Sequence, residues 1–210
     1  RSTLFPYTTL FRSSYLMGQD SGLTINATKA ETNPPSTKNQ APLSFAQQGV
    51  FAECQANPDA VQYNIPFALH FPKEIELEQL ANAVRKVVEM HPYILCHFVA
   101  DDENGIIQEP IPDFKVEIPV KTMTADELEA YKKEFVRPFD LEKGPCVRFE
   151  IVKTDKLTLL ADTHHLVSDG ASVDLLITQL TQILDGAAVE RENYTYYDFV
   201  RDEEISPETE

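Results

Sequence analysis

The most restrictive feature of this chain is a strand-like run that passes through two adjacent histidines into a helix-like run. Leu157 to Ala161 is apolar and of strand length, and His164 and His165 follow it. Asp169-Gly170 then precedes an amphipathic segment from Ala171 to Leu184. A strand that turns into a helix is a corner where α/β proteins usually build sites, and histidine is well suited to handling protons near neutral pH. The pattern predicts a site at this corner.

The periodicity elsewhere predicts more strands and helices of ordinary length. Apolar residues recur at helical spacing in three further segments, 44–57, 76–90 and 124–136, the last beginning with a capping box. They alternate or cluster as in strands in the segments 63–71, 93–99, 106–107, 116–120 and 147–151. Pro66 indicates an edge strand or a bulge. We therefore expect an α/β (α+β) fold in which a mixed sheet is covered by helices.

Composition narrows the functional classes. Hydrophobic residues make up 42% of the 210 residues, and 34 acidic against 18 basic residues give a net charge of −16. Phosphate binding needs a basic face, so we expect no nucleic-acid partner and no anionic membrane partner. Cys54, Cys96 and Cys146 lack metal-ligand spacing, so we expect no metal, and their low, odd number fits reduced thiols. No apolar run is long enough to span a membrane, which makes a cytoplasmic location the expectation.

The first 40 residues differ from the rest. Residues 1–14 show no helix or strand period and resemble translated vector or adapter sequence, so we expect them to be partly non-native. The stretch that follows is rich in Ser, Thr, Asn and Pro, which is typical of a linker. We therefore expect residues 1–40 to be a disordered leader and folding to begin near Ala41.

Several short motifs in order resemble the condensation domains of nonribosomal peptide synthetases, which belong to a wider acyltransferase superfamily. The stretch from His164 to Gly170 has that family's form HHxxxDG. Four further motifs are similar: 43–48 to LSxAQ, 90–95 to RHxxLR, 138–148 to PFDLxxxPLxR, and 196–199 to YxDF. Met90 and Leu95 stand where RHxxLR has arginines. The resemblance covers about Ala41 to Glu204.

This resemblance implies a fold, a reaction and partners. Residues 41–204 would be the N-terminal lobe of a two-lobed fold like that of chloramphenicol acetyltransferase, and 205–210 a truncated tail. The implied reaction forms an amide between a carrier-bound acyl or peptidyl thioester and a carrier-bound aminoacyl acceptor. The implied partners are the donor and acceptor carrier domains, a C-terminal lobe and an adenylation domain. The substrates would be attached to the 4′-phosphopantetheine of the carrier domains, and this chain would bind no cofactor directly.

The resemblance also implies residue roles. His165 is expected to face the substrate tunnel as a general base or a positioning group, and Gly170 to present its backbone to the substrate or to form a plain turn. His164 is expected to point the opposite way and to be structural, because side chains alternate along a strand. Asp169 is expected to form a buried structural pair with Arg148.

Three alternatives stay open from the sequence. The chain is also compatible with an epimerisation domain, with an acyltransferase of another HHxxxDG branch, or with a non-catalytic interaction fragment. An epimerisation domain usually carries an aromatic residue soon after the glycine, where this chain has Ala171-Ser172-Val173. A heterocyclisation domain is disfavoured because an Asp-based string would replace HHxxxDG.

Overall fold

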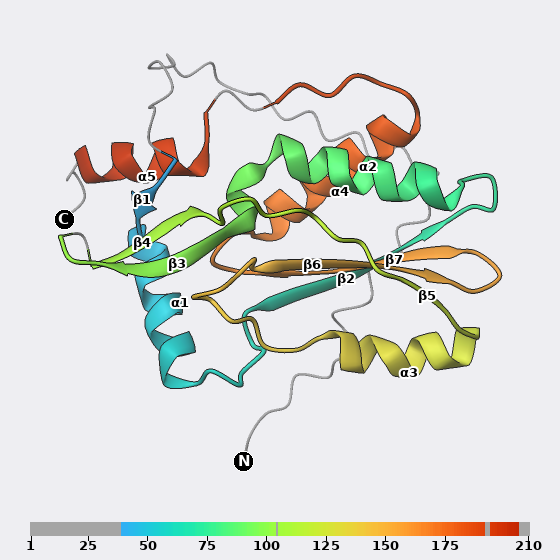
Figure 1. The fold of residues 1–210 in the computed structure, drawn as a ribbon, viewed down its shortest axis with the longest axis horizontal. Helices are drawn as coiled ribbons and strands as arrows, with labels where there is room; N and C mark the ends of the chain where they lie inside the picture. The colour runs from blue at the N-terminus through green and yellow to red at the C-terminus, as the bar shows by residue number, and fades with distance from the viewer. Residues whose placement is uncertain (1–38, 104, 192–193, 206–210) are drawn as a thin grey trace.

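A four-stranded mixed sheet forms the centre of the molecule (Figure 1). The computed structural model describes residues 39–103, 105–191 and 194–205, so nearly all of the expected leader and of the tail lies outside the described residues. The strand order is β2-β7-β6-β5, where the strands are β2 (Asn64–Phe71), β7 (Leu157–His164), β6 (Val147–Lys153) and β5 (Val120–Thr122). Neighbours pair antiparallel except β5, which is parallel to β6. The predicted mixed sheet is therefore confirmed, and β2, with its Pro66, lies at an edge.

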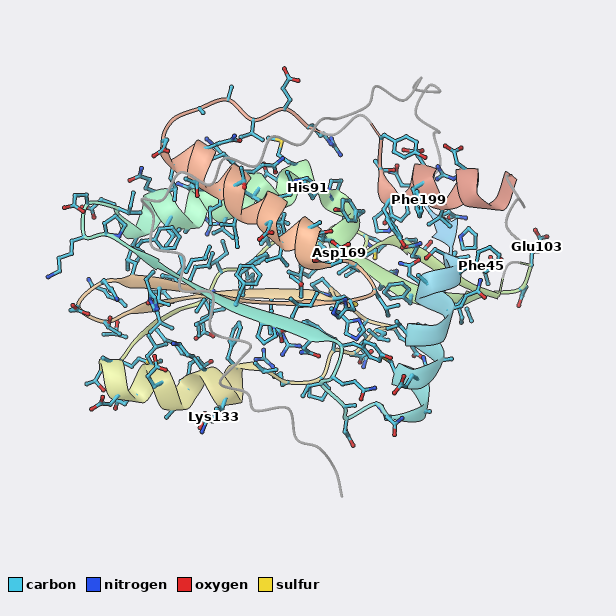
Figure 2. The ribbon with its side chains drawn as sticks, turned by 180° about the vertical axis from the view of Figure 1, so that it is seen from behind. Phe45, His91, Glu103, Lys133, Asp169 and Phe199 are labelled. Atoms are coloured by element: carbon cyan, nitrogen blue, oxygen red, sulfur yellow. The ribbon has the colours of Figure 1, made fainter. Side chains whose placement is uncertain are left out.

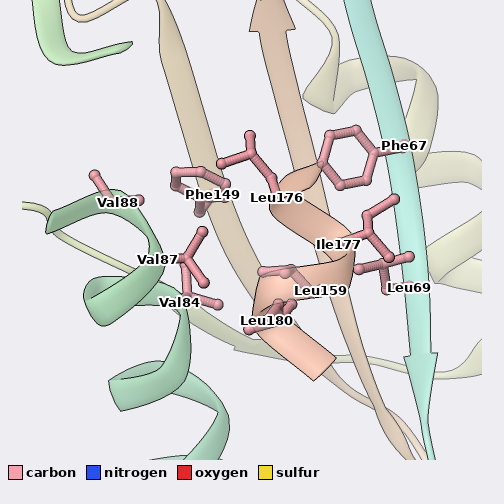
Figure 3. Close-up of a pocket in the computed structure, with 10 residues that line it drawn as sticks. All are labelled: Phe67, Leu69, Val84, Val87, Val88, Phe149, Leu159, Leu176, Ile177 and Leu180. Carbon is pink, nitrogen blue, oxygen red and sulfur yellow. The ribbon is translucent and has the colours of Figure 1, made fainter. Parts of the chain in front are cut away.

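Helices cover both faces of this sheet. Helices α2 (Leu77–Met90) and α4 (Gly170–Leu184) pack on one face and α3 (Ala125–Phe135) lies on the other (Figure 1). Strand β7 is buried along its whole length, with Leu159 in the core under α2 and α4 and Leu160 in the core under α3. Figure 3 shows the apolar side chains that line a small void in the core under α2 and α4. Its volume is about 20 Å³, which is too small for an organic ligand.

A third core, separate from those on the two faces of the sheet, lies at one end of the molecule. There β1 (Ala41–Pro42), β4 (Gly105–Pro110) and β3 (Cys96–Asp101) form a three-stranded sheet, flanked by α1 (Phe45–Ala56) and α5 (Tyr196–Ile205). Its buried residues include Leu166 and Val167, which directly follow the two histidines. The loop after β7 therefore connects the four-stranded sheet to this core, and this junction holds the histidines in place.

The structure corrects several sequence predictions. The capping box at Thr124 begins α3 as expected, and the structure shows a second capping box, at Ser44, at the start of α1. The strand predicted over 116–120 is wrong for most of its length, because Pro119, which lacks an N–H group for a ladder, precedes the short β5. The segment 92–95 is a 3-10 helix, η1 (Pro92–Leu95), rather than the start of a strand. Strand β1 and helix α5 have no counterpart among the predicted elements.

Candidate functional site

Backbone hydrogen bonds hold the loop after β7 on both of its sides. The His164 N–H donates to the Cys146 carbonyl at 2.9 Å, and the His165 N–H donates to the Tyr63 carbonyl at 2.9 Å. The Val167 N–H closes a turn by donating to the His164 carbonyl, also at 2.9 Å. The two histidines therefore lie on fixed backbone rather than on a free loop.

The two adjacent histidine side chains lie in different surroundings. His164 is only 4% exposed, whereas His165 is exposed. His165 lines a pocket of about 470 Å³, which we call the His165 pocket; its other lining residues are Ala46, Gln47, Val50, Gln62, Tyr63, Tyr93, Leu166, Val167, Ser168, Asp169, Ser172 and Tyr196. His164 lines a separate pocket of about 420 Å³ with Cys54, Phe139 and Asp140 among others. The structure thus places His165 toward an open, largely neutral pocket.

His164 is held as a neutral ring. Its Nδ1 accepts a hydrogen bond from the Leu166 N–H at 3.1 Å, so the ring hydrogen sits on Nε2. Nε2 lies 3.6 Å from the Cys54 Sγ. Burial, followed by unfavourable electrostatic interactions with His165 and Arg148, lowers the pKa of His164 to about 4. Its side chain therefore fixes the loop backbone, and it is poorly suited to taking up a proton from a substrate.

The neutral His164 predicts an acid-sensitive contribution to stability. A histidine whose folded pKa lies below its unfolded value of about 6.5 stabilises the fold while both states are neutral. This contribution is lost as pH falls from about 6.5 through 4, and amounts to roughly 3 kcal/mol in total. Urea unfolding of wild type and His164→Asn at pH 7 and pH 4.5 should show the wild-type advantage shrinking in acid. A difference independent of pH would contradict the assignment.

The expected pair between Arg148 and Asp169 is wrong. Arg148 Nη1 lies 3.6 Å from the Oδ2 of Asp162, and Arg148 faces Asp162 directly across the β6–β7 ladder. Arg148 also donates to the carbonyls of Phe135 and Pro138, at 3.3 and 3.1 Å, and its guanidinium lies 3.8 Å from the ring centroid of Phe139. The strand register brings the Asp162 carboxylate to Arg148, whereas Asp169 lies beyond the loop.

Asp162 is the buried charge of this site that the sequence analysis missed. It is fully buried, and its Oδ2 accepts a hydrogen bond from the Asn64 Nδ2 at 2.7 Å. Burial raises the pKa of Asp162 to about 6, although Arg148 and the Asn64 bond oppose the rise. The available signal was an acidic residue within the apolar strand that leads to the histidines.

Asp169 instead caps helix α4 (Figure 2). Its Oδ1 accepts hydrogen bonds from the Ser172 N–H at 2.8 Å and from the Ser172 hydroxyl at 2.7 Å, which lower the pKa of Asp169. Asp169 is exposed and lines the His165 pocket. Its role in the structure is to start the helix beside His165.

Gly170 is the first residue of α4 and is open to its surroundings. A Cβ atom built on it meets no atom within 4 Å, and its φ is not in the left-handed region. Packing within the described residues therefore gives no reason for a glycine here. The backbone of Gly170 is accessible to a molecule outside this lobe.

Substituting alanine at Gly170 should leave the lobe at least as stable as wild type. Alanine fits the space and reduces the entropy of the unfolded chain, an effect worth about 0.4–1 kcal/mol at compatible sites. Urea denaturation of Gly170→Ala measures this directly. A loss of more than about 1 kcal/mol would show that the site is packed more tightly than the structure indicates.

Across 39–103, 105–191 and 194–205, no three His, Cys, Asp or Glu side chains gather in a way that could hold a metal ion. Within the same ranges, no helix is long and apolar enough to cross a membrane.

The fold and this site define a family of enzyme domains. The sequence pattern of the family described as "Condensation domain" matches residues 37–209, so the chain belongs to the condensation domain family. It is 31% identical over 163 residues to bacitracin synthase 3 of Bacillus licheniformis and 30% identical over 178 residues to tyrocidine synthase 2 of Brevibacillus parabrevis. These matches cover 75% and 82% of this chain but only 2% and 5% of the two synthases.

Solved structures show the same fold. The starter condensation domain of the rhizomide synthetase RzmA superposes with a TM-score of 0.70 at 18% identity, covering 82% of this chain and 45% of that one. The condensation domain from the monacolin K polyketide synthase MokA gives a TM-score of 0.68 at 19% identity, covering 78% of this chain and 38% of that one. The chain therefore has the fold of one lobe of a chloramphenicol-acetyltransferase-like structure, and it spans less than half the length of these solved chains.

Proposed function

We propose that this lobe contributes His165 and Gly170 to a condensation domain that forms amide bonds in nonribosomal peptide synthesis. The single observation that carries the proposal is the placement of His165, which is exposed at an open pocket while its neighbour His164 is locked in the interior. If both histidines had only structural roles, there would be no reason for one of the two to be exposed at a pocket.

The proposed reaction joins two carrier-bound substrates. The amine of an aminoacyl thioester attacks the carbonyl carbon of an acyl or peptidyl thioester, so that a C–N bond forms and the C–S bond breaks. The phosphopantetheine thiolate of the donor leaves, and the amine gives up a proton. Both substrates arrive on the 4′-phosphopantetheine arms of carrier domains, which are the proposed partners together with a C-terminal lobe and an adenylation domain, in the cytoplasm.

His165 is the residue placed to act on the attacking amine. The His165 pocket has no lysine or arginine among its lining residues, and its titratable side chains other than tyrosine are His165 and the helix-capping Asp169. A neutral imidazole there can accept a hydrogen bond from the amine and favour loss of its proton. Gly170 follows the same loop, at the start of α4. Its backbone N–H is placed to donate a hydrogen bond to the thioester oxygen during the attack.

Residues 41–210 alone should not catalyse condensation. His165 is exposed in this lobe, so the lobe by itself cannot hold two pantetheine arms in register, and positioning supplies a large part of such catalysis. The measurement is amide formation from carrier-bound donor and acceptor, followed by mass spectrometry of the acceptor carrier. Product formed by this lobe alone at the rate of a two-lobed domain would overturn this part of the proposal.

A further inference from the structure

The ring nitrogens of His165 are not held by hydrogen bonds within the part of the lobe that the structure describes. Among the residues that the structure describes, none makes a hydrogen bond or an ion pair with its ring nitrogens. An exposed histidine ring without such a bond is free to change rotamer. Its nitrogens are then not fixed at hydrogen-bonding distance from a substrate. Something other than a carboxylate partner must therefore restrict it.

Tyr63 contacts His165 through both its backbone and its ring. The Tyr63 carbonyl accepts the His165 N–H at 2.9 Å. The two rings meet edge to face, with centroids 6.3 Å apart and an interplanar angle of 88°, a geometry that aromatic rings favour. The Tyr63 ring also lies 6.1 Å from that of His164. Tyr63 therefore forms the wall of the His165 pocket against which the His165 ring rests.

The ring of Tyr63 is itself held by helix α1. Its hydroxyl donates to the Oε2 of Glu53 at 2.6 Å, and the other oxygen of that carboxylate accepts a hydrogen bond from the Gln62 Nε2 at 2.5 Å. These bonds lower the pKa of Glu53, which keeps its carboxylate charged. Hydrogen bonds to a charged carboxylate are among the stronger ones. A connected chain of contacts thus runs from α1 through Tyr63 to His165.

We propose that Tyr63, anchored by Glu53, is the positioning residue that fixes the side chain of His165 for the reaction. The inference rests on the proposed function, because it assigns Tyr63 a part in the step that His165 assists. Tyr63 acts through His165 and does not touch the reacting atoms. Its hydroxyl donates a hydrogen bond to Glu53 and takes no direct part in the reaction.

The test compares four variants in a two-lobed condensation domain built on this lobe. Tyr63→Leu removes the ring, Tyr63→Phe keeps the ring but removes the hydroxyl, and Glu53→Gln weakens the anchor. Asp59→Asn is the matched control, because it removes one exposed carboxylate from the turn after α1. We expect kcat to fall about tenfold or more in Tyr63→Leu and a few-fold in Tyr63→Phe and Glu53→Gln, with KM for the carrier-bound acceptor nearly unchanged. Asp59→Asn should match wild type.

Two further measurements separate this inference from its basis. In His165→Ala, adding Tyr63→Leu should cost nothing more, because residues that act as a unit are non-additive. Wild-type kcat in Tyr63→Leu, while His165→Ala is inactive, would overturn the role of Tyr63 and leave the proposed function standing. Full activity of His165→Ala would instead overturn the proposed function. If Tyr63→Leu fails to fold, the surface variant Glu53→Gln decides: a reduced kcat supports the inference and an unchanged kcat contradicts it.

Discussion

Replacing His165 by alanine is expected to lower kcat for condensation by about a hundredfold or more in a two-lobed domain, while the lobe stays folded. A positioned acid or base typically contributes 10²–10⁴-fold, and His165 is the exposed histidine of the adjacent pair. The fold should survive because the side chain is exposed and its loop is held by backbone bonds. The measurement is single-turnover amide formation between loaded carriers, with circular dichroism as the folding check.

A second histidine serves as the matched control for this variant. His97 lies on β3 and lines neither pocket beside the histidine loop. His97→Ala should therefore condense substrates at close to the wild-type rate. Equal loss in both variants, or wild-type activity in His165→Ala, would show that His165 has no special part in the reaction.

Replacing Arg148 by leucine is expected to destabilise the lobe by about 3–5 kcal/mol, the cost of leaving one partner of a buried ion pair without the other. Arg148 is 13% exposed and Asp162 fully buried, so the Asp162 carboxylate would lose its counter-charge inside the protein. The double variant Arg148→Leu with Asp162→Asn should be destabilised by less than the sum of the single variants. Urea denaturation of the four proteins gives the coupling energy.

The pH dependence and a control variant sharpen this test. Burial raises the folded pKa of Asp162 to about 6, above its unfolded value of about 3.9. The group therefore contributes stability at pH below about 3.9, and this contribution is lost as the pH rises through 6. Protonation of Asp162 should therefore reduce the cost of Arg148→Leu in acid. Asp169→Ala should cost about 1 kcal/mol as a lost helix cap and show no coupling to Arg148. Coupling of Arg148 to Asp169 in place of Asp162 would contradict the observed pairing.

Local patterns in the sequence were sufficient to predict β7 and α4, the strand and helix on either side of the histidine loop. Strand β7 is buried on both faces and α4 is amphipathic, so each has a distinct apolar pattern. The opposite placement of His164 and His165 followed from the alternation of side chains along a strand. The family resemblance supplied what these patterns could not, namely the family itself and the expectation of a second lobe and of a reaction.

Contacts between residues far apart in the sequence could not be predicted from local patterns. The partner of Arg148 depends on the register between β6 and β7, and no spacing along the chain shows which carboxylate faces it. The contacts of His164 with Cys54 and of Tyr63 with Glu53 depend on how α1 packs beside the histidine loop. Helix α5 was missed because the stretch around it is mostly polar and acidic, and its buried residues Tyr197 and Val200 pack on the small core at the end of the molecule.

The most direct test of the central claim is the product that a two-lobed domain built on this lobe forms from two loaded carriers. An aminoacyl or acyl thioester on the donor carrier and an aminoacyl thioester on the acceptor carrier are mixed with the domain, and both carriers are analysed by intact-protein mass spectrometry. We predict that the acyl group moves to the acceptor carrier as an amide, leaving a free pantetheine thiol on the donor. An acceptor mass that stays unchanged, whether the donor keeps its acyl group or loses it by hydrolysis, would contradict the assignment.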